Sequence, residues 1–280
     1  MVVREISTDG LEGLREIMDP DVAENIGREG FKGLGVFDRY TAEFLAGMVW
    51  EFFEDGEEAR IEWLKSLSPA AGELLFEEYA GAAAGDGILR TGVEIPLGDQ
   101  AVEELLLREN FELELGESED LYITLGELGV LKKKVPEGAG GVRSIDTLSS
   151  KQFERALKEA LKQGRKIISP DLDRMPMYYF DKDVSSVFVD GDGEIRGLFL
   201  LHLTASGKLK SELIYAKKPD TGRCLLNMID FSIRAAEKLY PENTVVILRR
   251  NKADARALTS RLLPDATGRD AVRGVQGAIP

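Results

Sequence analysis

One order of secondary-structure elements occurs twice along the 280 residues of this chain. Each occurrence reads as a helix, then antiparallel strands, then a strand that runs into a helix, another strand and another helix. The first covers about residues 2–128 and the second about 145–280. A repeat of half the chain length predicts two domains of one architecture, each large enough to bury its own core.

The boundary between the two domains is expected in a stretch rich in Lys, Gly and Pro, KKKVPEGAGG at 132–141. This predicts a first domain at 1–130, a linker at 131–143 and a second domain at 144–280. The charge divides at the same place, because residues 1–130 carry 9 basic and 31 acidic side chains, a net charge of −22, whereas the remainder carries +8. An anionic ligand is therefore expected at the second domain and a cationic one at the first.

The composition is typical of a soluble globular protein, with 43% apolar and 31% charged residues. The longest apolar run, Phe44–Phe53, is interrupted by Gly47 and Glu51, so no membrane partner is expected. The single cysteine, Cys224, excludes an intramolecular disulfide, and the start MVVREIST has no apolar signal region; both favour a cytoplasmic location. A pI of about 4.8 argues against a nucleic-acid partner.

Apolar alternation and turn residues predict most elements of the first half. Strands are expected at Val2–Ile6, Gly33–Phe37, Phe44–Phe53, Ala59–Leu67 and Ile88–Ile95. Ser68 and Asp99 are predicted to cap two helices, and Leu11, Leu14 and Ile17 are spaced for another that Asp9 would cap. Phe111–Leu115 and Leu121–Leu125 are predicted to close the first sheet as an antiparallel pair.

The second half repeats this pattern with one strand fewer. Strands are predicted at Ser186–Val189, Ile195–Leu203, Lys210–Lys217 and Thr244–Arg249, and helices at Phe153–Leu161, at 224–239 and at Asn251–Leu263. The remaining Thr267–Pro280 has room for one strand. The second sheet is therefore expected to have an open edge, which the first half or a second copy in a homodimer would cover.

This order of elements resembles the fold of the GNAT acetyltransferases, duplicated in tandem. The sequence likeness lies at 33–47, at 101–111, and at 194–200 followed by 251–263. The resemblance implies an α/β fold of two GNAT-like domains, each a mixed, twisted sheet flanked by helices. It also implies acetyl-CoA as the donor and a primary amine of a small molecule or peptide as the acceptor.

In that family the pantetheine arm lies between two splayed parallel strands, which would be 59–67 with 88–95 and 210–217 with 244–249. The CoA pyrophosphate needs backbone N–H groups at a helix N-terminus. The R/Q-x-x-G-x-G/A motif that supplies them is missing from both halves, but the second half offers cationic charge and a glycine. The residues expected to bind the cofactor are Lys218, Thr221, Gly222, Arg223, Cys224 and Asn251.

Acyl transfer also needs a base to deprotonate the amine, and a carboxylate on the central strand often supplies it in this family. Glu62 and Glu212 lie on the corresponding strands and are the expected catalytic residues. The tyrosine that often serves as acid has no counterpart in either half. His202 lies in an apolar strand and is expected to be structural, and DGDG at 190–193 is expected to form a hairpin turn, so no metal site is predicted.

N-acetyl transfer is the leading hypothesis for function. The missing phosphate motif supports an alternative, a catalytically inactive GNAT-fold protein that binds a ligand or serves in assembly. A different acyl-CoA or an aminoacyl donor on the same fold is a third hypothesis. The carboxylates on both central strands favour an enzyme.

Overall fold

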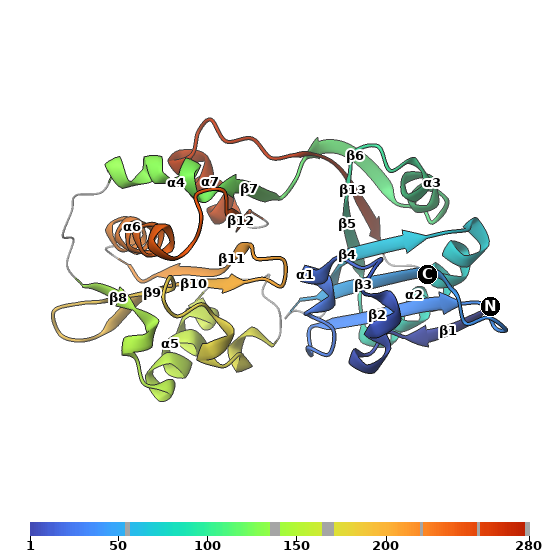
Figure 1. Cartoon of the computed structure of the whole chain (residues 1–280), viewed down its shortest axis with the longest axis horizontal. Helices are drawn as coiled ribbons and strands as arrows, with labels where there is room; N and C mark the ends of the chain where they lie inside the picture. The colour runs from blue at the N-terminus through green and yellow to red at the C-terminus, as the bar shows by residue number, and fades with distance from the viewer. Residues whose placement is uncertain (54–56, 135–140, 164–170, 219–220, 251–252, 278–280) are drawn as a thin grey trace. The chain divides into compact units, whose positions relative to one another are not determined.

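The computed structural model describes residues 1–53, 57–134, 141–163, 171–218, 221–250 and 253–277. The chain divides into two compact units (Figure 1). Unit 1 consists of Met1–Ser118, Lys166–Asp171 and Arg269–Pro280, and unit 2 of Glu119–Arg165 and Leu172–Gly268. Each unit contains one mixed sheet flanked by helices, which confirms the predicted fold class.

Unit 1 contains a seven-stranded sheet in the order β1-β2-β3-β4-β5-β13-β6. Its strands are β1 (Val2–Glu5), β2 (Phe31–Phe37), β3 (Phe44–Phe52), β4 (Glu58–Ser66), β5 (Arg90–Pro96), β6 (Glu112–Glu117) and β13 (Asp270–Gly277). β4 and β5 are parallel, and the other neighbours are antiparallel. The predicted turn at Glu54-Asp55-Gly56 lies outside the described residues.

Alternating residues of β3 show which helices cover each face of this sheet. Met48 and Trp50 pack against α2 (Pro69–Asp86) and α3 (Gln100–Arg108). Val49, between them, packs on the opposite face against η1 (Thr8–Leu14) and the residues around α1 (Pro20–Ala23). The predicted caps of α2 and α3 are confirmed, since the side chains of Ser68 and Asp99 accept hydrogen bonds from the backbone N–H groups of Ala71 and Val102.

The helix predicted from Leu11, Leu14 and Ile17 is a 3-10 helix, η1, which ends at Leu14. Asp9 lies within this helix and does not cap it. The N-cap residue is Ser7, whose side chain makes no capping hydrogen bond. Gly10 and Gly13 fall in the same segment and lower its α-helix propensity. Burial of Leu14 holds the segment against the sheet.

Unit 2 contains a six-stranded sheet in the order β7-β12-β11-β10-β9-β8. Its strands are β7 (Asp120–Thr124), β8 (Val142–Ser144), β9 (Ser186–Val189), β10 (Ile195–Leu203), β11 (Leu209–Ala216) and β12 (Val245–Arg249). β11 and β12 are parallel. Its helices are α4 (Leu125–Leu128), η2 (Gly129–Lys134), η3 (Ile145–Thr147), α5 (Ser150–Gln163), η4 (Leu172–Arg174), η5 (Met177–Tyr179), α6 (Thr221–Leu239) and α7 (Ala253–Leu262).

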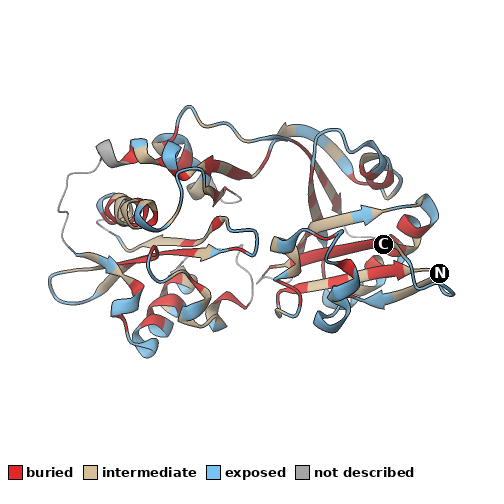
Figure 2. Cartoon of the chain, in the orientation of Figure 1, coloured by how far each residue is buried: buried red, intermediate tan, exposed pale blue. Residues whose placement is uncertain are grey.

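The two faces of this second sheet are also covered by different helices. Phe199 and Leu201 of β10 pack in one apolar core with residues of α4, α6 and α7. α5 contacts β10 as well, and its Phe153 packs on Phe180, with ring centroids 5.7 Å apart. Buried residues concentrate on the central strands, such as β3 and β10 (Figure 2). Within the described residues, no helix is both long enough and apolar enough to cross a membrane.

The last strand of each half of the chain pairs in the sheet formed mainly by the other half. β13 lies between β5 and β6, and pairs with seven residues of the first and six of the second. β7 pairs with β12 along Asp120–Thr124. The predicted pairing of Phe111–Leu115 with Leu121–Leu125 is therefore wrong. The physical reason is that a strand's own apolar pattern fixes which face it buries, not which strand it pairs with.

This exchange also gives unit boundaries that differ from the expected domains 1–130 and 144–280. The chain passes from unit 1 to unit 2 between Ser118 and Glu119 and returns for its last strand between Gly268 and Arg269, and Lys166–Asp171 is also assigned to unit 1. The unit 1 residues at the first and last of these crossings are hydrogen-bonded, because Ser118 N donates to Arg269 O at 2.8 Å. Of the expected linker, 135–140 lie outside the described residues. β7 covers the edge of the second sheet that was expected to be open, so that edge gives no reason for a homodimer.

Substitution of Gly274 in β13 tests the exchange. A Cβ there would lie 2.8 Å from Leu113 Cδ2 and 2.8 Å from Val93 Cγ1, on the two neighbouring strands of unit 1. We expect Gly274→Ala to lower the free energy of unfolding by about 1–3 kcal/mol. Guanidinium unfolding would measure the loss, and hydrogen exchange should locate it in β5 and β6.

Gly277→Ala is the matched control, since no described atom lies within 4 Å of a Cβ at that position of the same strand. Its unfolding free energy should stay within about 0.5 kcal/mol of the wild type. Equal effects of the two substitutions, or faster exchange confined to unit 2, would contradict the position of β13.

Candidate functional site

The parallel strands β11 and β12 of unit 2 separate soon after they meet. They pair at two positions only, Leu209 with Val246 and Lys210 with Ile247. β11 then continues to Ala216 and β12 to Arg249 without further pairing between them. The two strands therefore diverge toward their C-terminal ends, which is the arrangement predicted for 210–217 with 244–249.

Unit 1 has a similar separation between β4 and β5. These strands pair from Glu58 with Arg90 to Ile61 with Val93. β4 then continues to Ser66 and β5 to Pro96 without pairing to each other. Both sheets thus have a gap in the hydrogen-bonded ladder at corresponding places.

A β-bulge occurs in the same place in each sheet, beside the gap. In unit 2, Leu201 pairs with Ser211 and Leu200 with Leu213, so Glu212 is the extra residue of β11. In unit 1, the register of β4 against β3 skips Glu62 in the same way. Bulges redirect side chains and are common next to active sites. The two carboxylates predicted to be catalytic therefore occupy equivalent bulges.

Glu212 lies in a partly enclosed polar cluster. Its Oε1 accepts a hydrogen bond from Tyr179 Oη at 3.4 Å and lies 3.8 Å from Lys210 Nζ, and its side chain is 8% exposed. The Tyr179 ring stacks on His202, with centroids 4.2 Å apart and planes 8° apart. His202 Nδ1 also lies 2.8 Å from Tyr179 O. His202, expected to be structural, thus positions the tyrosine that contacts the candidate base.

Glu62 has an equivalent basic neighbour two residues earlier in the strand. Arg60 Nε lies 3.4 Å from Glu62 Oε1, and the two side chains are 15% and 18% exposed. Arg60 also stands opposite Glu51 of β3, which is buried. In both units the carboxylate is thus held next to a cation from the same strand.

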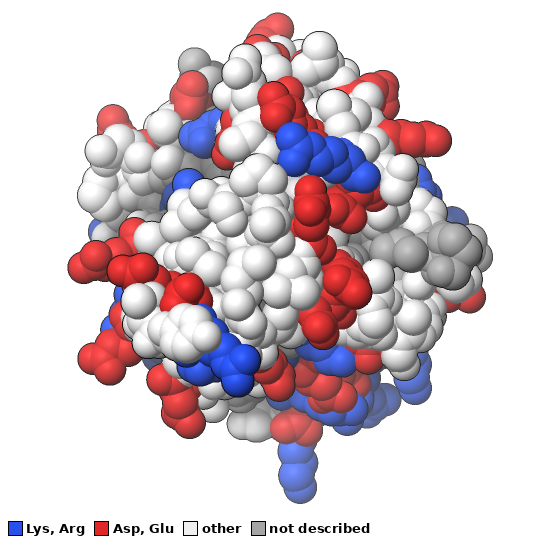
Figure 3. All heavy atoms as spheres, turned by 90° about the vertical axis from the view of Figure 1, so that its right-hand side faces the viewer, with Lys and Arg blue, Asp and Glu red and all other residues white. Residues whose placement is uncertain are grey.

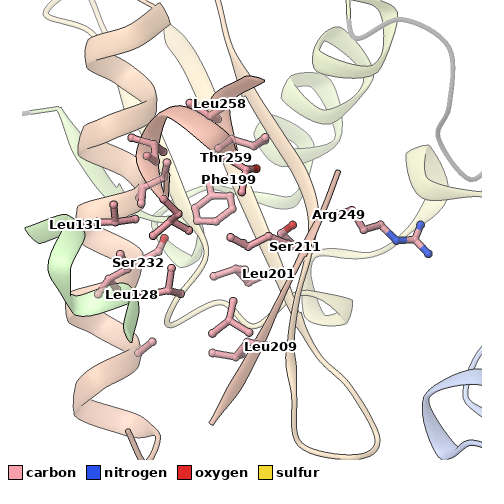
Figure 4. Close-up of a pocket in the computed structure, with 18 of the residues that line it drawn as sticks. Leu128, Leu131, Phe199, Leu201, Leu209, Ser211, Ser232, Arg249, Leu258 and Thr259 are labelled. Atoms are coloured by element: carbon pink, nitrogen blue, oxygen red, sulfur yellow. The ribbon is translucent and has the colours of Figure 1, made fainter. Parts of the chain in front are cut away.

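An apolar cavity of about 80 Å³ lies in unit 2, beside the point where β11 and β12 separate. Residues of α4, η2, β10, β11, α6, β12 and α7 line it, and 16 of these 20 residues are apolar. Leu201, Leu209 and Ser211 line the wall formed by the sheet, whereas Arg249 extends away from the cavity (Figure 4). The cavity can therefore accept an apolar group and little else.

In unit 1, aromatic rings fill the core between α2 and the sheet. Trp50 and Tyr79 meet edge to face with centroids 5.0 Å apart, and Phe76 meets Phe111 at 5.8 Å. Tyr79 Oη lies 2.7 Å from Thr91 Oγ1 of β5. Burial raises the pKa of Tyr79 to about 12. The two units thus share the same gap between parallel strands, but aromatic rings fill the core beside it in unit 1, whereas an apolar cavity lies there in unit 2.

The N-terminus of α6 follows β11 and carries most of the residues predicted to bind the cofactor. Lys218, Gly222 and Arg223 are exposed there and Thr221 is half-buried, whereas Cys224 is 1% exposed and faces the core. Asn251 lies outside the described residues. Lys217 Nζ, in contrast, lies 2.8 Å from Glu194 and 3.1 Å from Glu159, which raise its pKa. The exposed cations of this helix end are therefore Lys218 and Arg223.

The corresponding helix end in unit 1 offers much less to a phosphate. Only Leu67 and Ser68 connect β4 to α2, and Pro69 at the first helical position has no N–H group. The Ser68 side chain already accepts a hydrogen bond from Ala71 N. The side chain of a capping residue thus occupies the place where a bound anion would sit.

Two features of this site were missed in the sequence. Tyr179 lies in the short helix η5, which has no apolar period. Lys210 could have been found, because K-S-E at 210–212 matches R-I-E at 60–62 on the equivalent strand. Within the described ranges, no three His, Cys, Asp or Glu side chains gather as metal ligands.

The charge difference between the two halves of the sequence persists in the compact units. Counted over their residues, unit 1 has a net charge of −18 and unit 2 of +4. On the face of unit 1 drawn in Figure 3, Asp and Glu side chains form a row beside a patch of uncharged residues. The field around unit 1 therefore favours cationic ligands.

The sequence matches no protein-family model and no curated protein. Its structure is similar to a tandem GNAT protein from the clavulanic acid biosynthesis pathway, with a TM-score of 0.64 and 11% identity, covering 100% of this chain and 99% of that chain. It is also similar to a GCN5-related N-acetyltransferase from Sphaerobacter thermophilus, with a TM-score of 0.58 and 14% identity, covering 100% of this chain and 96% of that chain.

The structure is also similar to Saccharomyces cerevisiae N-myristoyltransferase with bound myristoyl-CoA, with a TM-score of 0.55 and 12% identity, covering 100% of this chain and 80% of that chain. At such identities the likeness concerns the fold. This chain has a tandem GNAT-like fold, as the resemblance predicted.

The raised pKa of Tyr79 gives a prediction about stability in alkali. The folded chain holds the phenol proton more tightly than the unfolded chain, so this contribution is complete below pH 10 and is lost as the pH rises to about 12. Wild type should lose up to about 3 kcal/mol of unfolding free energy in that window that Tyr79→Phe does not lose. Urea unfolding at pH 9 to 12 would measure the difference.

Tyr40→Phe is the control, because Tyr40 is 92% exposed. Its stability should follow that of the wild type at every pH. A constant difference between wild type and Tyr79→Phe across the window would contradict the burial of that hydroxyl.

Proposed function

We propose that unit 2 transfers an acyl group from an acyl-coenzyme A thioester to a primary amine of a small molecule or peptide. The single observation that carries this proposal is the gap between β11 and β12, with the bulge residue Glu212 on one side and the apolar cavity on the other. The GNAT-like fold supports the same chemistry. Acetyl-CoA is the first donor to test, although the likeness to a structure with bound myristoyl-CoA supports other acyl groups as well.

The donor would lie with its pantetheine arm between β11 and β12 and its pyrophosphate at the N-terminus of α6. Backbone N–H groups there stabilise anions, and the exposed side chains of Lys218 and Arg223 add positive charge. Gly222 has no Cβ and would let a phosphate approach the backbone closely, and Thr221 would offer its hydroxyl as a hydrogen-bond donor. The backbone of Cys224 would complete the proposed donor site among the described residues.

The amine nitrogen would attack the thioester carbonyl carbon as the C–S bond breaks. Before the attack, one proton leaves the ammonium for a base; the second nitrogen proton passes to the departing sulfur, so that an amide and the CoA thiol form. We assign the role of the base to Glu212, directly or through a water molecule. Lys210 Nζ lies 3.8 Å from this carboxylate, and the Tyr179 hydroxyl, which donates a hydrogen bond to it at 3.4 Å, would orient it.

The two reactants would reach the gap from opposite faces of the sheet. His202 pairs with Lys210 and the neighbouring Leu201 pairs with Ser211, so these two pairs point to opposite sides. Leu201 and Ser211 line the cavity, whereas Glu212 contacts Lys210 on the other side. The acyl group would thus lie toward α6 and the amine toward Glu212.

For unit 1 the proposal is a non-catalytic role. The capped N-terminus of α2 and the aromatic filling of its core support this alternative. Its negative charge would attract cationic acceptors by long-range electrostatics. The lone Cys224, in a chain without a disulfide, fits a reducing cytoplasm.

Replacement of Glu212 tests the proposed base. Glu212→Gln should lower kcat by about 10²–10⁴-fold, because the carboxylate no longer accepts the proton. Release of CoA thiol from acetyl-CoA would be followed with a panel of polyamines, amino sugars and N-terminal peptides. Glu62→Gln, the same change in the equivalent bulge of unit 1, should keep kcat within about twofold of the wild type. A large loss in Glu62→Gln alone would move the reaction to unit 1.

Donor binding can be tested without an acceptor. Arg223→Ala should weaken acetyl-CoA binding about tenfold, or about 1.4 kcal/mol, because a phosphate contact is lost. Lys238→Ala, at the exposed C-terminal end of the same helix, should leave the Kd unchanged. Titration calorimetry gives both constants, and failure of wild type to bind millimolar acetyl-CoA or longer acyl-CoA thioesters would overturn the proposed function.

A further inference from the structure

The apolar cavity of unit 2 is larger than an acetyl group needs. We infer that the donor of unit 2 carries an aliphatic acyl chain of about four to six carbons, whose end lies in this cavity. The inference rests on the proposed function and names the substrate class of the same site.

The position of the cavity connects it to the reacting bond. Ser211 and Leu209, two of its lining residues, belong to β11 on either side of the last residue that pairs with β12. Leu248, which also lines it, is the first residue of β12 beyond that pairing. A thioester held between the separated strands therefore has the cavity directly beside it, on the α6 face.

The chemistry of the lining selects a hydrocarbon. The hydroxyl of Ser232 is already bonded to Ser186 Oγ at 3.1 Å, and that of Thr259 donates to Ala255 O at 2.7 Å. Arg249 extends away from the space (Figure 4). A polar ligand would lose its hydrogen bonds to water there and find few new ones, whereas transfer of a methylene chain from water into the cavity is favourable in free energy.

The volume sets the chain length. An engineered cavity of about 150 Å³ holds benzene, which has six carbons. The 80 Å³ found here therefore suits about three methylene or methyl groups beyond the acetyl unit. Longer chains would need the walls formed by α6 and α7 to move apart.

The test is titration calorimetry of the full chain with free CoA and with acetyl-, butyryl-, hexanoyl- and decanoyl-CoA. Each methylene buried in the cavity should tighten binding about fourfold, from about 0.8 kcal/mol per methylene. The Kd should therefore fall about 15-fold from acetyl- to butyryl-CoA, fall further to hexanoyl-CoA, and rise again at decanoyl-CoA.

A matched pair of substitutions on α7 locates the effect. Ala255 lines the cavity, whereas Ala257 on the same helix is exposed. Ala255→Leu should bring the ratio of hexanoyl-CoA to acetyl-CoA affinity close to one, and Ala257→Leu should keep the wild-type ratio. Ile214→Ala, which enlarges the cavity from β11, should move the preferred chain toward eight carbons and gives a second readout if Ala255→Leu does not fold.

The outcomes separate this inference from the proposed function. If all acyl-CoA thioesters bind with the affinity of acetyl-CoA, the donor site exists and the chain-length inference is wrong. If none binds, both are wrong. A preference for hexanoyl-CoA that Ala255→Leu leaves intact would place the chain elsewhere and would also overturn the inference.

Discussion

In each unit, two parallel strands can separate because the second of them, β12 or β5, pairs with another strand along its opposite edge. β12 makes its continuous ladder with β7, along all five of its residues, and meets β11 at only two positions. In unit 1, β5 is held in the same way by β13 along seven residues. Because the outer strand has a complete partner, its inner edge can leave the ladder without leaving the sheet. The candidate site exists only because these closing strands are in place.

The two units place this frame in different surroundings. In unit 2 the gap is flanked by aliphatic side chains that leave a cavity, and the following helix has exposed cations at its start. In unit 1 the corresponding core is filled by interlocking aromatic rings, and Ser68 and Pro69 close the helix start. Equivalent bulges with an acidic residue beside a basic one persist in both. The two units thus share a backbone geometry, but only the surroundings in unit 2 leave space and positive charge for a ligand.

Most elements could be predicted from the sequence, because apolar content and turn residues are local properties, whereas Glu62 and Glu212 were selected through the resemblance to a family. The apolar run at 44–53 predicted β3, the turn at 190–193 predicted β10 beside it, and Ser68 and Asp99 marked the starts of α2 and α3. The partners of β6 and β7 could not be predicted, since apolar alternation does not specify a neighbouring strand. The cavity and the position of Tyr179 were beyond local pattern for the same reason: they arise where residues distant in sequence pack together.

The position of β13 near the end of the sequence has a consequence for biosynthesis. Ribosomes release the chain from its N-terminus onward, so β5 and β6 emerge more than 150 residues before the strand that joins them. Until then, unit 1 has two unsatisfied strand edges exposed to other nascent chains. Such long-range pairing is slow to form. Unit 1, although most of it is made first, can therefore complete its sheet only after β13 has been synthesised.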